Sequence, residues 1–324
     1  MTKFHAIKLT NLTPLHLGTG NENYDFSADA LQSDTLSASL TALRCMKGKT
    51  MDTARFLSSF TISSAFPFCG EHYFLPRPQG KLNKLTVQGQ TETECRKKLK
   101  KVKFIDRELW YLLICGQPVN IKPGQLQGEL ITTDDVHIQI SQPQVMQRVY
   151  VPRNGEDAQP FFFTWDFFRP DAGLYCLIDA DTETFKEIHE LFIELGENGI
   201  GTDRNIGGGK FNVETDLIEL PQVKDANATL LLSLYLPEES EIVSLHLSES
   251  RYTLLTRNGF IAGSTEPAFR HLRKKSIYMF GCGSLFQTVN PLYGKVVNLA
   301  PEWNDPRMHP VYRSGKPLSI FIKQ

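Results

Sequence analysis

The residues best suited to chemistry lie in one glycine-rich segment, residues 199–210, which reads GIGTDRNIGGGK. Glycine lets a chain turn sharply and lets a ligand approach main-chain amides without an intervening side chain. Arg204, Asn205 and Lys210 add donors that suit phosphate groups. Phe211 follows Lys210 where a Walker A motif needs Ser or Thr, so a nucleoside triphosphate site is disfavoured. A phosphate-binding loop and a plain surface turn are the two interpretations.

A second candidate segment is residues 15–23, LHLGTGNEN, which places His16 beside Gly18 and Gly20. Histidine titrates near pH ~6.5, so His16 could act as a general acid or base. A single histidine without a partner is more often a packing or hydrogen-bonding residue. Three nearby aspartates are candidates for metal-assisted cleavage, although loops and helix caps commonly carry such residues: Asp25, Asp29 and Asp34.

A run of six basic residues in eight positions, residues 96–103 (RKKLKKVK), stands out from an otherwise neutral chain. Such blocks suit nucleic-acid phosphates, and the alternative is a solvated helix face. Lys98, Lys100 and Lys101 are our candidates for phosphate contact in this run. A weaker basic cluster follows later and has the same two interpretations: Arg270, Arg273, Lys274 and Lys275.

Composition limits the class of protein. The 35 Lys and Arg against 36 Asp and Glu give a net charge of −1, which argues against free, non-specific nucleic-acid binding. The 324 residues suggest about two domains of ~150 residues. The six cysteines form no CxxC pair, so no zinc or thioredoxin-like motif is predicted. No signal peptide and no apolar run of ~18 residues is visible, and we expect a cytoplasmic protein without a membrane role.

The elements that must position these residues follow from hydrophobic periodicity. Apolar alternation predicts strands, and helical spacing predicts one helix that Ser33 or Asp34 caps and another that Asp181 or Thr182 caps. In chain order, the expected elements are a strand at 4–12, a helix at 33–48, strands at 136–141 and 174–178, a helix at 182–195 and a strand at 211–215. This β-α-β-β-α-β order is that of ferredoxin-like and RRM-like domains. An insertion of about 49–132 is too long to be a plain loop.

A second, smaller domain is predicted to begin near residue 224, after a polar linker. Its expected features are a strand at 230–236, a hairpin at Asn258 and Gly259, a turn at 281–284 and a final strand at 318–322. The fold class is therefore α+β, with domains at 1–223 and 224–324 and the glycine-rich segment before the last strand of the first.

Several of these motifs occur together in one known family. They are LHLGTG at 15–20, SDTLSASL at 33–40, FPFCGEHYFLPRP at 66–78, KLKKVKFI at 98–105, GIGTDRNIGGGKF at 199–211, GCGSLF at 281–286 and HPVYRSGKPLSIFI at 309–322. With them, the chain resembles the RAMP superfamily of CRISPR effector proteins, and within it the fourth subunit of type III-A (Csm) complexes.

The resemblance implies a non-catalytic RNA-binding subunit with two ferredoxin-like or RRM-like domains, the second of them degenerate. Such a subunit holds the 5′ repeat-derived tag of the CRISPR RNA (crRNA), and no metal or cofactor is expected. It docks against the large polymerase-like (cyclase) subunit and the neighbouring backbone RAMP subunit. The implied tag contacts are His16, Gly18, Gly20, Arg148, Gly201, Arg204, Asn205, Gly207, Gly208, Gly209 and Lys210.

Other features of the resemblance concern the edges of this groove. The helix at 33–40 is a candidate for the groove edge or for contact with the large subunit. After Arg148 the chain reads VYVPRNGEDAQPFFFTWDFF, a departure from the short polar stretch that is usual in the family. Aromatic side chains available for base stacking are Phe66, Phe68 and Tyr73.

Three alternatives stay open. The first is a metal-independent endoribonuclease that processes CRISPR repeats with His16, Tyr24 or a lysine as acid and base. The second is a backbone subunit that cleaves target RNA through a loop aspartate such as Asp29. The third is a protein-interaction module that binds no RNA.

Overall fold

A computed structural model describes residues 1–18, 27–28, 30–152, 154, 157–261, 269, 272–301, 305, 307–308 and 311–324. Five residues singled out above lie outside the described residues: Gly20, Tyr24, Asp25, Asp29 and Arg270.

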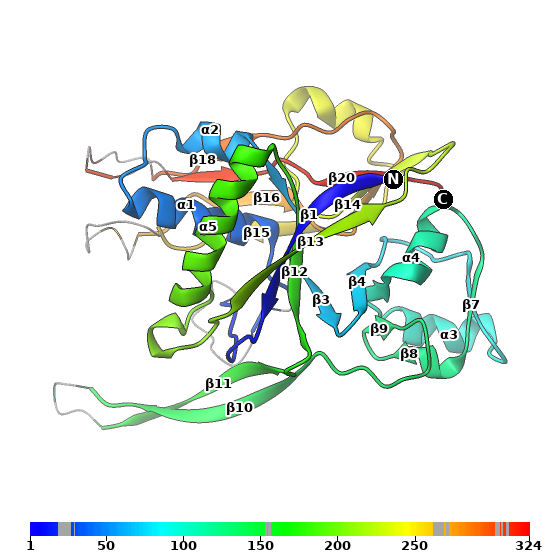
Figure 1. The fold of residues 1–324 in the computed structure, drawn as a ribbon, viewed down its shortest axis with the longest axis horizontal. Coiled ribbons are helices and arrows are strands. Elements are labelled where there is room, and N and C mark those ends of the chain that lie inside the picture. The colour runs from blue at the N-terminus through cyan, green and yellow to red at the C-terminus, as the bar shows by residue number, and fades with distance from the viewer. Residues whose placement is uncertain are drawn as a thin grey trace.

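The protein is built on one long sheet whose centre is formed by strands far apart in sequence (Figure 1). From one edge, the first four strands of the sheet are β13 (Asn212–Leu220), β1 (Thr2–Thr10), β12 (Ala172–Asp179) and β3 (Phe66–Cys69), each antiparallel to the next. The sheet continues through β4 (His72–Pro76), β6 (Phe104–Asp106), β9 (Leu130–Ile131) and β8 (Leu126–Gln127), and β2 (Thr61–Ile62) pairs with β12. The strands expected at 4–12, 174–178 and 211–215 are confirmed as β1, β12 and β13.

Two helices cover one face of this sheet, namely α1 (Ser33–Met46) and α5 (Thr182–Asn198). Leu36 of α1 and Phe192 of α5 are buried in one cluster with Ile7 of β1, as the period-2 alternation of β1 requires. Asp181 caps α5, because its side chain accepts a hydrogen bond from the Thr184 amide at 2.8 Å. The residue at the cap position of α1 is Gln32, so capping by Ser33 or Asp34 is wrong.

The opposite face of the sheet is covered by the insertion and by the C-terminal half together. Phe4 of β1, Trp110 of the insertion and Leu230 of the C-terminal half belong to one buried cluster. To this face the insertion contributes helices α3 (Glu92–Leu99) and α4 (Arg107–Ile114), the short helix η1 (Pro123–Gln125), and the parallel strands β5 (Leu85–Val87) and β7 (Val119–Ile121). Helix α2 (Thr53–Ser58) packs instead in the cluster of α1 and α5. Because the two halves share this core, they are packed against each other and are not separate bodies joined by a flexible linker.

The strand expected at 136–141 is wrong over most of its length. Residues 132–140 form no strand, and the partners of β12 come instead from β2 and β3 inside the expected insertion. The Gln127 side chain takes the place of a neighbouring strand, since it donates to the Val136 carbonyl at 2.8 Å and accepts from the Ile138 amide at 2.9 Å. The apolar alternation therefore does not mark a strand, because Ile138 is buried within a loop and Val136 is exposed.

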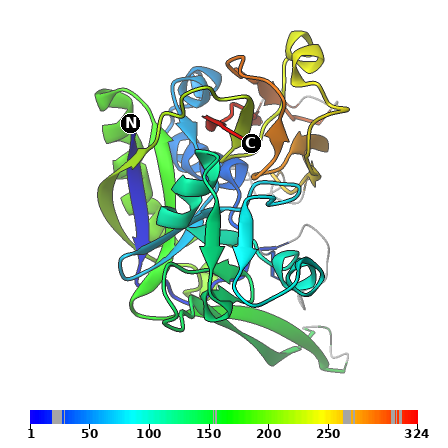
Figure 2. The same ribbon diagram turned by 90° about the vertical axis from the view of Figure 1, so that its right-hand side faces the viewer.

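A long hairpin, β10 (Ser141–Tyr150) with β11 (Gln159–Phe168), projects from the body of the protein (Figures 1 and 2). The aromatic stretch that follows Arg148 in the sequence is its second strand, in which Phe161 pairs with Arg148. Two-stranded ribbons are marginal alone, so the hairpin needs an anchor at its base.

The C-terminal half is made of short strands. A three-stranded sheet holds β17 (Leu285–Phe286), β14 (Ala228–Leu231) and β20 (Ser319–Ile322), and two ribbons hold β15 (Leu254–Arg257) with β16 (Ile277–Phe280) and β18 (Val296–Asn298) with β19 (Tyr312–Ser314). The short helix η3 (Glu239–Leu245) follows β14. The turn at 281–284 and the last strand are confirmed. The hairpin at Asn258 and Gly259 is wrong, because β15 pairs with β16, which begins only at Ile277.

A buried carboxylate links α1 to this C-terminal half. Asp34 accepts hydrogen bonds from Arg257 Nε at 2.9 Å and Nη2 at 2.8 Å, and Arg313 Nη1 lies 2.9 Å from its Oδ2. Burial alone would raise the pKa of the Asp34 carboxyl, but Arg313 and Arg257 outweigh burial and hold this pKa below its ordinary value. The carboxylate therefore stays charged and holds two arginines from separate ribbons.

Asp34→Asn should lower the free energy of unfolding by about 3–5 kcal/mol, because it leaves buried guanidinium groups without their counter-charge. Urea denaturation at neutral pH measures this loss, and Asp171→Asn, which breaks the exposed pair with Arg169, is the control with little expected effect. Since the folded pKa of Asp34 is lowered, the difference between wild type and Asp34→Asn should shrink as pH falls below ~4. An equal loss in both variants would contradict the role of Asp34.

Candidate nucleic-acid interface

Three segments meet beside the end of α5: residues 13–18 after β1, the glycine-rich segment 199–210 and the base of the β10–β11 hairpin. The Gly209 amide donates to the Pro14 carbonyl at 2.9 Å, and the Thr202 amide donates to the His16 carbonyl at 3.1 Å. Leu15 exchanges two backbone hydrogen bonds with Asp166 of β11, at 3.0 and 2.9 Å. The 13–18 segment therefore lies between the glycine-rich segment and the hairpin and binds both.

The glycines of this site serve mainly the packing of the chain on itself. A Cβ at Gly209 would lie 1.8 Å from the Ile200 carbonyl oxygen, and one at Gly201 would lie 2.4 Å from the His16 carbonyl oxygen. Both residues also have positive φ, at +66° and +99°. Gly207 differs, because its φ is +88° but a Cβ there would meet nothing within 4 Å. Close approach of a ligand to the backbone is thus available at Gly207, whereas Gly201 and Gly209 are occupied by neighbouring main chain.

Gly18 and Gly208 also lie close to neighbouring atoms, but less tightly than Gly201 and Gly209. A Cβ at Gly18 would lie 2.8 Å from the Thr202 side chain, and one at Gly208 would lie 3.1 Å from the Pro14 carbonyl oxygen. The Gly208 amide donates to the Asp203 carbonyl at 3.1 Å. Gly208 is therefore buried inside the loop, whereas Gly18 is exposed and approaches only the Thr202 methyl group.

His16 is a positioning residue in this structure. Its side chain is buried, Nδ1 lies 2.8 Å from the Thr164 carbonyl oxygen, and its ring packs on Phe163 with centroids 4.5 Å apart. These contacts fasten the 13–18 segment to the hairpin. The imidazole faces β11 and not solvent, which removes the geometry that a surface acid or base would need.

Asp203 anchors the hairpin to the glycine-rich segment. Its Oδ2 accepts hydrogen bonds from Arg148 Nη1 and from Trp165 Nε1, each at 3.0 Å. The Arg148 guanidinium also lies 4.3 Å from the ring centroid of Phe163 and 4.8 Å from that of Trp165. Arg148 is therefore ion-paired and stacked, and it positions the hairpin from the face that the glycine-rich segment covers.

Sequence reasoning missed Asp203 and Trp165. The available signal was that Asp203 is the one acidic residue in GIGTDRNIGGGK and that Trp165 stands in an alternating aromatic stretch. Neither observation identifies the partner, because the two residues are brought together only by the fold.

The groups that remain accessible are on the outer side of the site. Arg204, Asn205 and Lys210 are exposed, the first two of them in η2 (Arg204–Ile206), and in the described part of the chain neither cation has an ion-pair partner. The hairpin beside them exposes large apolar side chains, namely Val145, Met146, Val149, Tyr150 and Phe162. Free cations next to an exposed apolar ribbon suit a single-stranded nucleic acid, which offers phosphates and unstacked bases.

Other predicted contacts lie elsewhere. Lys98, Lys100 and Lys101 are exposed on and just after α3, across the molecule from the hairpin (Figure 1). Phe66, Phe68 and Tyr73 are buried, so their prediction as stacking platforms is wrong. The reason is that β3 and β4 lie inside the long sheet and pack in the cluster that α4 and the C-terminal half share.

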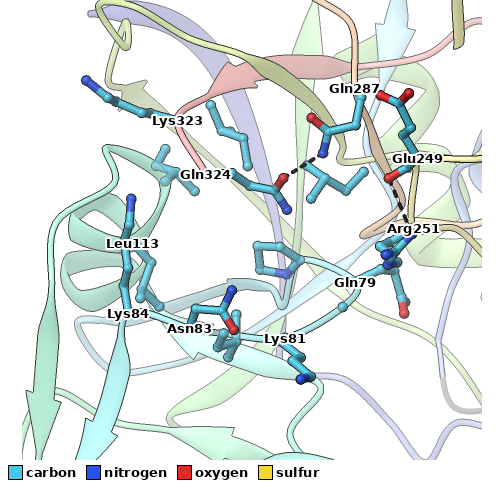
Figure 3. A pocket seen from close by; sticks show the side chains of 16 residues that line it. Gln79, Lys81, Asn83, Lys84, Leu113, Glu249, Arg251, Gln287, Lys323 and Gln324 are labelled. Atoms are coloured by element: carbon cyan, nitrogen blue, oxygen red, sulfur yellow. Dashed lines mark hydrogen bonds between the residues drawn. The ribbon is translucent and has the colours of Figure 1, made fainter. Parts of the chain in front are cut away.

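A cavity of about 710 Å³ lies between the insertion and the C-terminal half. Gln324 and Asn83 point toward its centre, whereas Lys81 and Lys323 point away (Figure 3). Its cations therefore do not converge on a common point.

Among the described residues, no group of three or more His, Cys, Asp or Glu side chains could hold a metal ion. None of the helices described is both long and apolar enough to cross a membrane.

Comparison with known proteins identifies chains of similar sequence. Residues 224–322 match the family model of the CRISPR Csm4 C-terminal domain. The CRISPR system Cms protein Csm4 of Mycobacterium tuberculosis is 26% identical over 310 residues, which cover 94% of each chain. Its namesake from Thermococcus onnurineus is 25% identical over 289 residues, which cover 86% of this chain and 87% of the relative.

Solved structures share the fold. A crystal structure of a Csm1-Csm4 cassette in complex with cA4 contains a chain with a TM-score of 0.65 at 20% identity, covering 99% of this chain and 98% of that one. A Csm3-Csm4 subcomplex of the type III-A CRISPR-Cas interference complex contains one with a TM-score of 0.64 at 15% identity and full coverage of both.

Fold and sequence together define a subunit of a CRISPR effector complex. Its residues 224–322 match the Csm4 C-terminal domain, and the chain is similar to Csm4 proteins along nearly its whole length.

The packing of the glycine-rich segment leads to a test by two matched substitutions. Gly207→Ala and Gly209→Ala both introduce left-handed strain of ~1–2 kcal/mol. Gly209→Ala should lose a further ~1–3 kcal/mol, because its methyl group collides with the Ile200 carbonyl while that of Gly207→Ala meets open space. Thermal and urea unfolding measure both values. Equal losses would show that the close approach of residues 200 and 209 is not needed.

Proposed function

We propose that this chain is the non-catalytic RNA-binding subunit of a type III-A effector complex and that it binds the 5′ repeat-derived tag of the crRNA. The observation that carries the proposal is the pair of free cations, Arg204 and Lys210, beside the exposed apolar ribbon of the hairpin. Phosphates bind the cations and bases rest on apolar side chains, as single-stranded RNA requires. Contacts on this outer surface are compatible with a net charge of −1, because only the local charge matters.

The arrangement of the sheet supports a RAMP-type scaffold. The order β13-β1-β12-β3, with α1 following β1 and α5 following β12, is that of a ferredoxin-like unit. The glycine-rich segment joins α5 to β13, the last strand of this unit. In this proposal the C-terminal half is a second, degenerate unit of the same kind, beginning near residue 224.

Partner subunits are proposed from the relatives. Solved structures of similar fold contain Csm4 with Csm1 or with Csm3. We infer that this chain likewise contacts the large polymerase-like subunit and a neighbouring backbone subunit, in the cytoplasm. Six cysteines without disulfides fit a reducing compartment.

The proposal assigns no catalysis to the chain. His16, the candidate acid or base of a repeat-processing nuclease, is buried against Phe163 and bound to the Thr164 carbonyl. A nuclease of that kind needs its acid and base within reach of the scissile phosphate and the 2′-hydroxyl group.

Arg204→Glu combined with Lys210→Glu should lower the crRNA content of the reconstituted complex at least ~10-fold. A hydrogen bond to a charged group contributes ~1.5–3 kcal/mol, and a tenfold change in affinity corresponds to about 1.4 kcal/mol. The RNA-to-protein ratio after size-exclusion chromatography measures the effect. Lys186→Glu with Lys224→Glu makes the same charge change at exposed positions outside the site and should retain RNA. Equal RNA content in both double variants would refute tag binding here.

Purified chain incubated with repeat RNA in EDTA should leave the RNA intact. A discrete cut that His16→Ala abolishes would replace the proposal with the endoribonuclease alternative. Denaturing gel electrophoresis of 5′-labelled RNA reads out the result. A cut that persists in His16→Ala indicates contamination by another nuclease.

A further inference from the structure

The ion-pair cluster around Asp34 holds more positive charge than its carboxylate can balance. Arg257 and Arg313 flank Asp34, and burial together with repulsion from Arg313 and Arg257, which the attraction of Asp34 offsets only in part, lowers the pKa of the nearby Lys274 to about 8. Three cations thus share one carboxylate, and among the described residues no second carboxylate is paired with them. Buried charges are normally paired, so this surplus indicates a missing anion.

Unused donors accompany the surplus charge. Arg313 is only 5% exposed, yet neither its Nε nor its Nη1 forms a hydrogen bond, although Nη1 lies 2.9 Å from Asp34 Oδ2. Arg313 Nη2 donates to the Asn258 carbonyl at 3.2 Å. The Lys274 ammonium group has no hydrogen-bonding partner in the described part of the chain, and Arg257 is partly exposed at the edge of the cluster. The cluster therefore has both a deep unsatisfied guanidinium and an edge that an anion can reach.

The cluster is connected to the candidate interface by a short stretch of chain. The Leu17 amide donates to Ser27 Oγ at 3.0 Å, and the Ala28 amide donates to the Leu17 carbonyl at 2.7 Å. Asp34 follows Ser27 by only a few residues, so the Cα atoms of these two residues lie within about 25 Å of each other, the reach of an extended chain of that length. A few nucleotides of single-stranded RNA span such a distance.

We propose that the cluster formed by Arg257, Lys274 and Arg313 around Asp34 is a second phosphate-binding site, which takes a backbone phosphate of the RNA strand leaving the glycine-rich segment. This inference rests on the proposed function and adds to it a contact supplied by the C-terminal half. A guanidinium and an ammonium group at the edge match a phosphodiester, whose negative charge relieves the surplus.

Lys274→Met is the informative variant, because Lys274 is not hydrogen-bonded to Asp34 and its loss leaves the structural ion pairs in place. Full-length chain is titrated with fluorescently labelled single-stranded tag RNA over a series of salt concentrations. We expect affinity to fall about three- to tenfold and the slope of log K against log salt to fall by ~0.7, the value for one lost phosphate contact. The melting temperature of the RNA-free variant should rise, since an uncompensated buried charge is removed.

Lys275→Met is the matched control, because it removes the same charge from the neighbouring, exposed position. It should leave the salt slope and melting temperature near those of wild type. Equal loss of affinity in Lys274→Met and Lys275→Met would overturn the proposal in favour of a diffuse basic surface. A wild-type salt slope in Lys274→Met would overturn it as well.

Two further measurements identify which anion occupies the site and distinguish failure of this inference from failure of the proposed function. Stabilisation of wild type by inorganic phosphate, absent in Lys274→Met, together with unchanged RNA binding would assign the site to free phosphate and overturn the RNA contact. If Lys274→Met binds RNA normally but no longer assembles with the other subunits, a protein carboxylate fills the site and the proposal fails. If the double variant Arg204→Glu with Lys210→Glu loses RNA and Lys274→Met does not, only the second phosphate site is refuted. If both variants retain RNA, the proposed function is refuted as well.

Discussion

The close contact between the glycine-rich segment and residues 13–18 is the constraint on which the candidate interface depends. The His16 carbonyl lies where a side chain would be at Gly201, and the Gly209 amide donates to the Pro14 carbonyl at 2.9 Å. At Gly209 a side chain is excluded by the Ile200 carbonyl of the segment itself. This contact sets the position of Asp203, and Asp203 in turn holds Arg148 and Trp165 of the hairpin. The orientation of a ribbon that would be marginal alone therefore follows from two glycines in a distant loop.

Two carboxylates perform the same task at different places. Asp203 joins a loop to the hairpin, and Asp34 joins α1 to the ribbons of the C-terminal half. Each forms ion pairs with arginines that a count of charges would assign to nucleic-acid binding. Under the proposed function, RNA meets the cations that these carboxylates leave unpaired or only partly balanced, so a chain of net charge −1 can still present defined binding positions.

Sequence periodicity predicted the elements that have one buried face and one exposed face. Leu36 and Leu40 mark α1, Ile188 and Phe192 mark α5, and β1 alternates between two cores. Periodicity failed where contacts with residues distant in sequence decide the local structure. Residues 136–140 alternate like a strand, but Val136 and Ile138 bond to the Gln127 side chain. Asn258 and Gly259 follow β15, whose partner β16 begins only at Ile277. The glycine-rich segment was found by composition, whereas its anchor Asp203 depends on the fold.

A residue can therefore belong to a recognition motif without touching the ligand. His16 and Gly209 lie inside the motifs that identify the family, yet the first is covered by Phe163 and the second by the Ile200 carbonyl. Under the proposed function, a substitution at either residue would disturb the loop and weaken RNA binding indirectly, with the same outcome as the loss of a direct contact. Arg204 and Lys210 differ because they are exposed and unpaired, so charge reversal there changes the surface and leaves the packing intact. The direct contacts are thus to be sought among the residues that the fold does not already use.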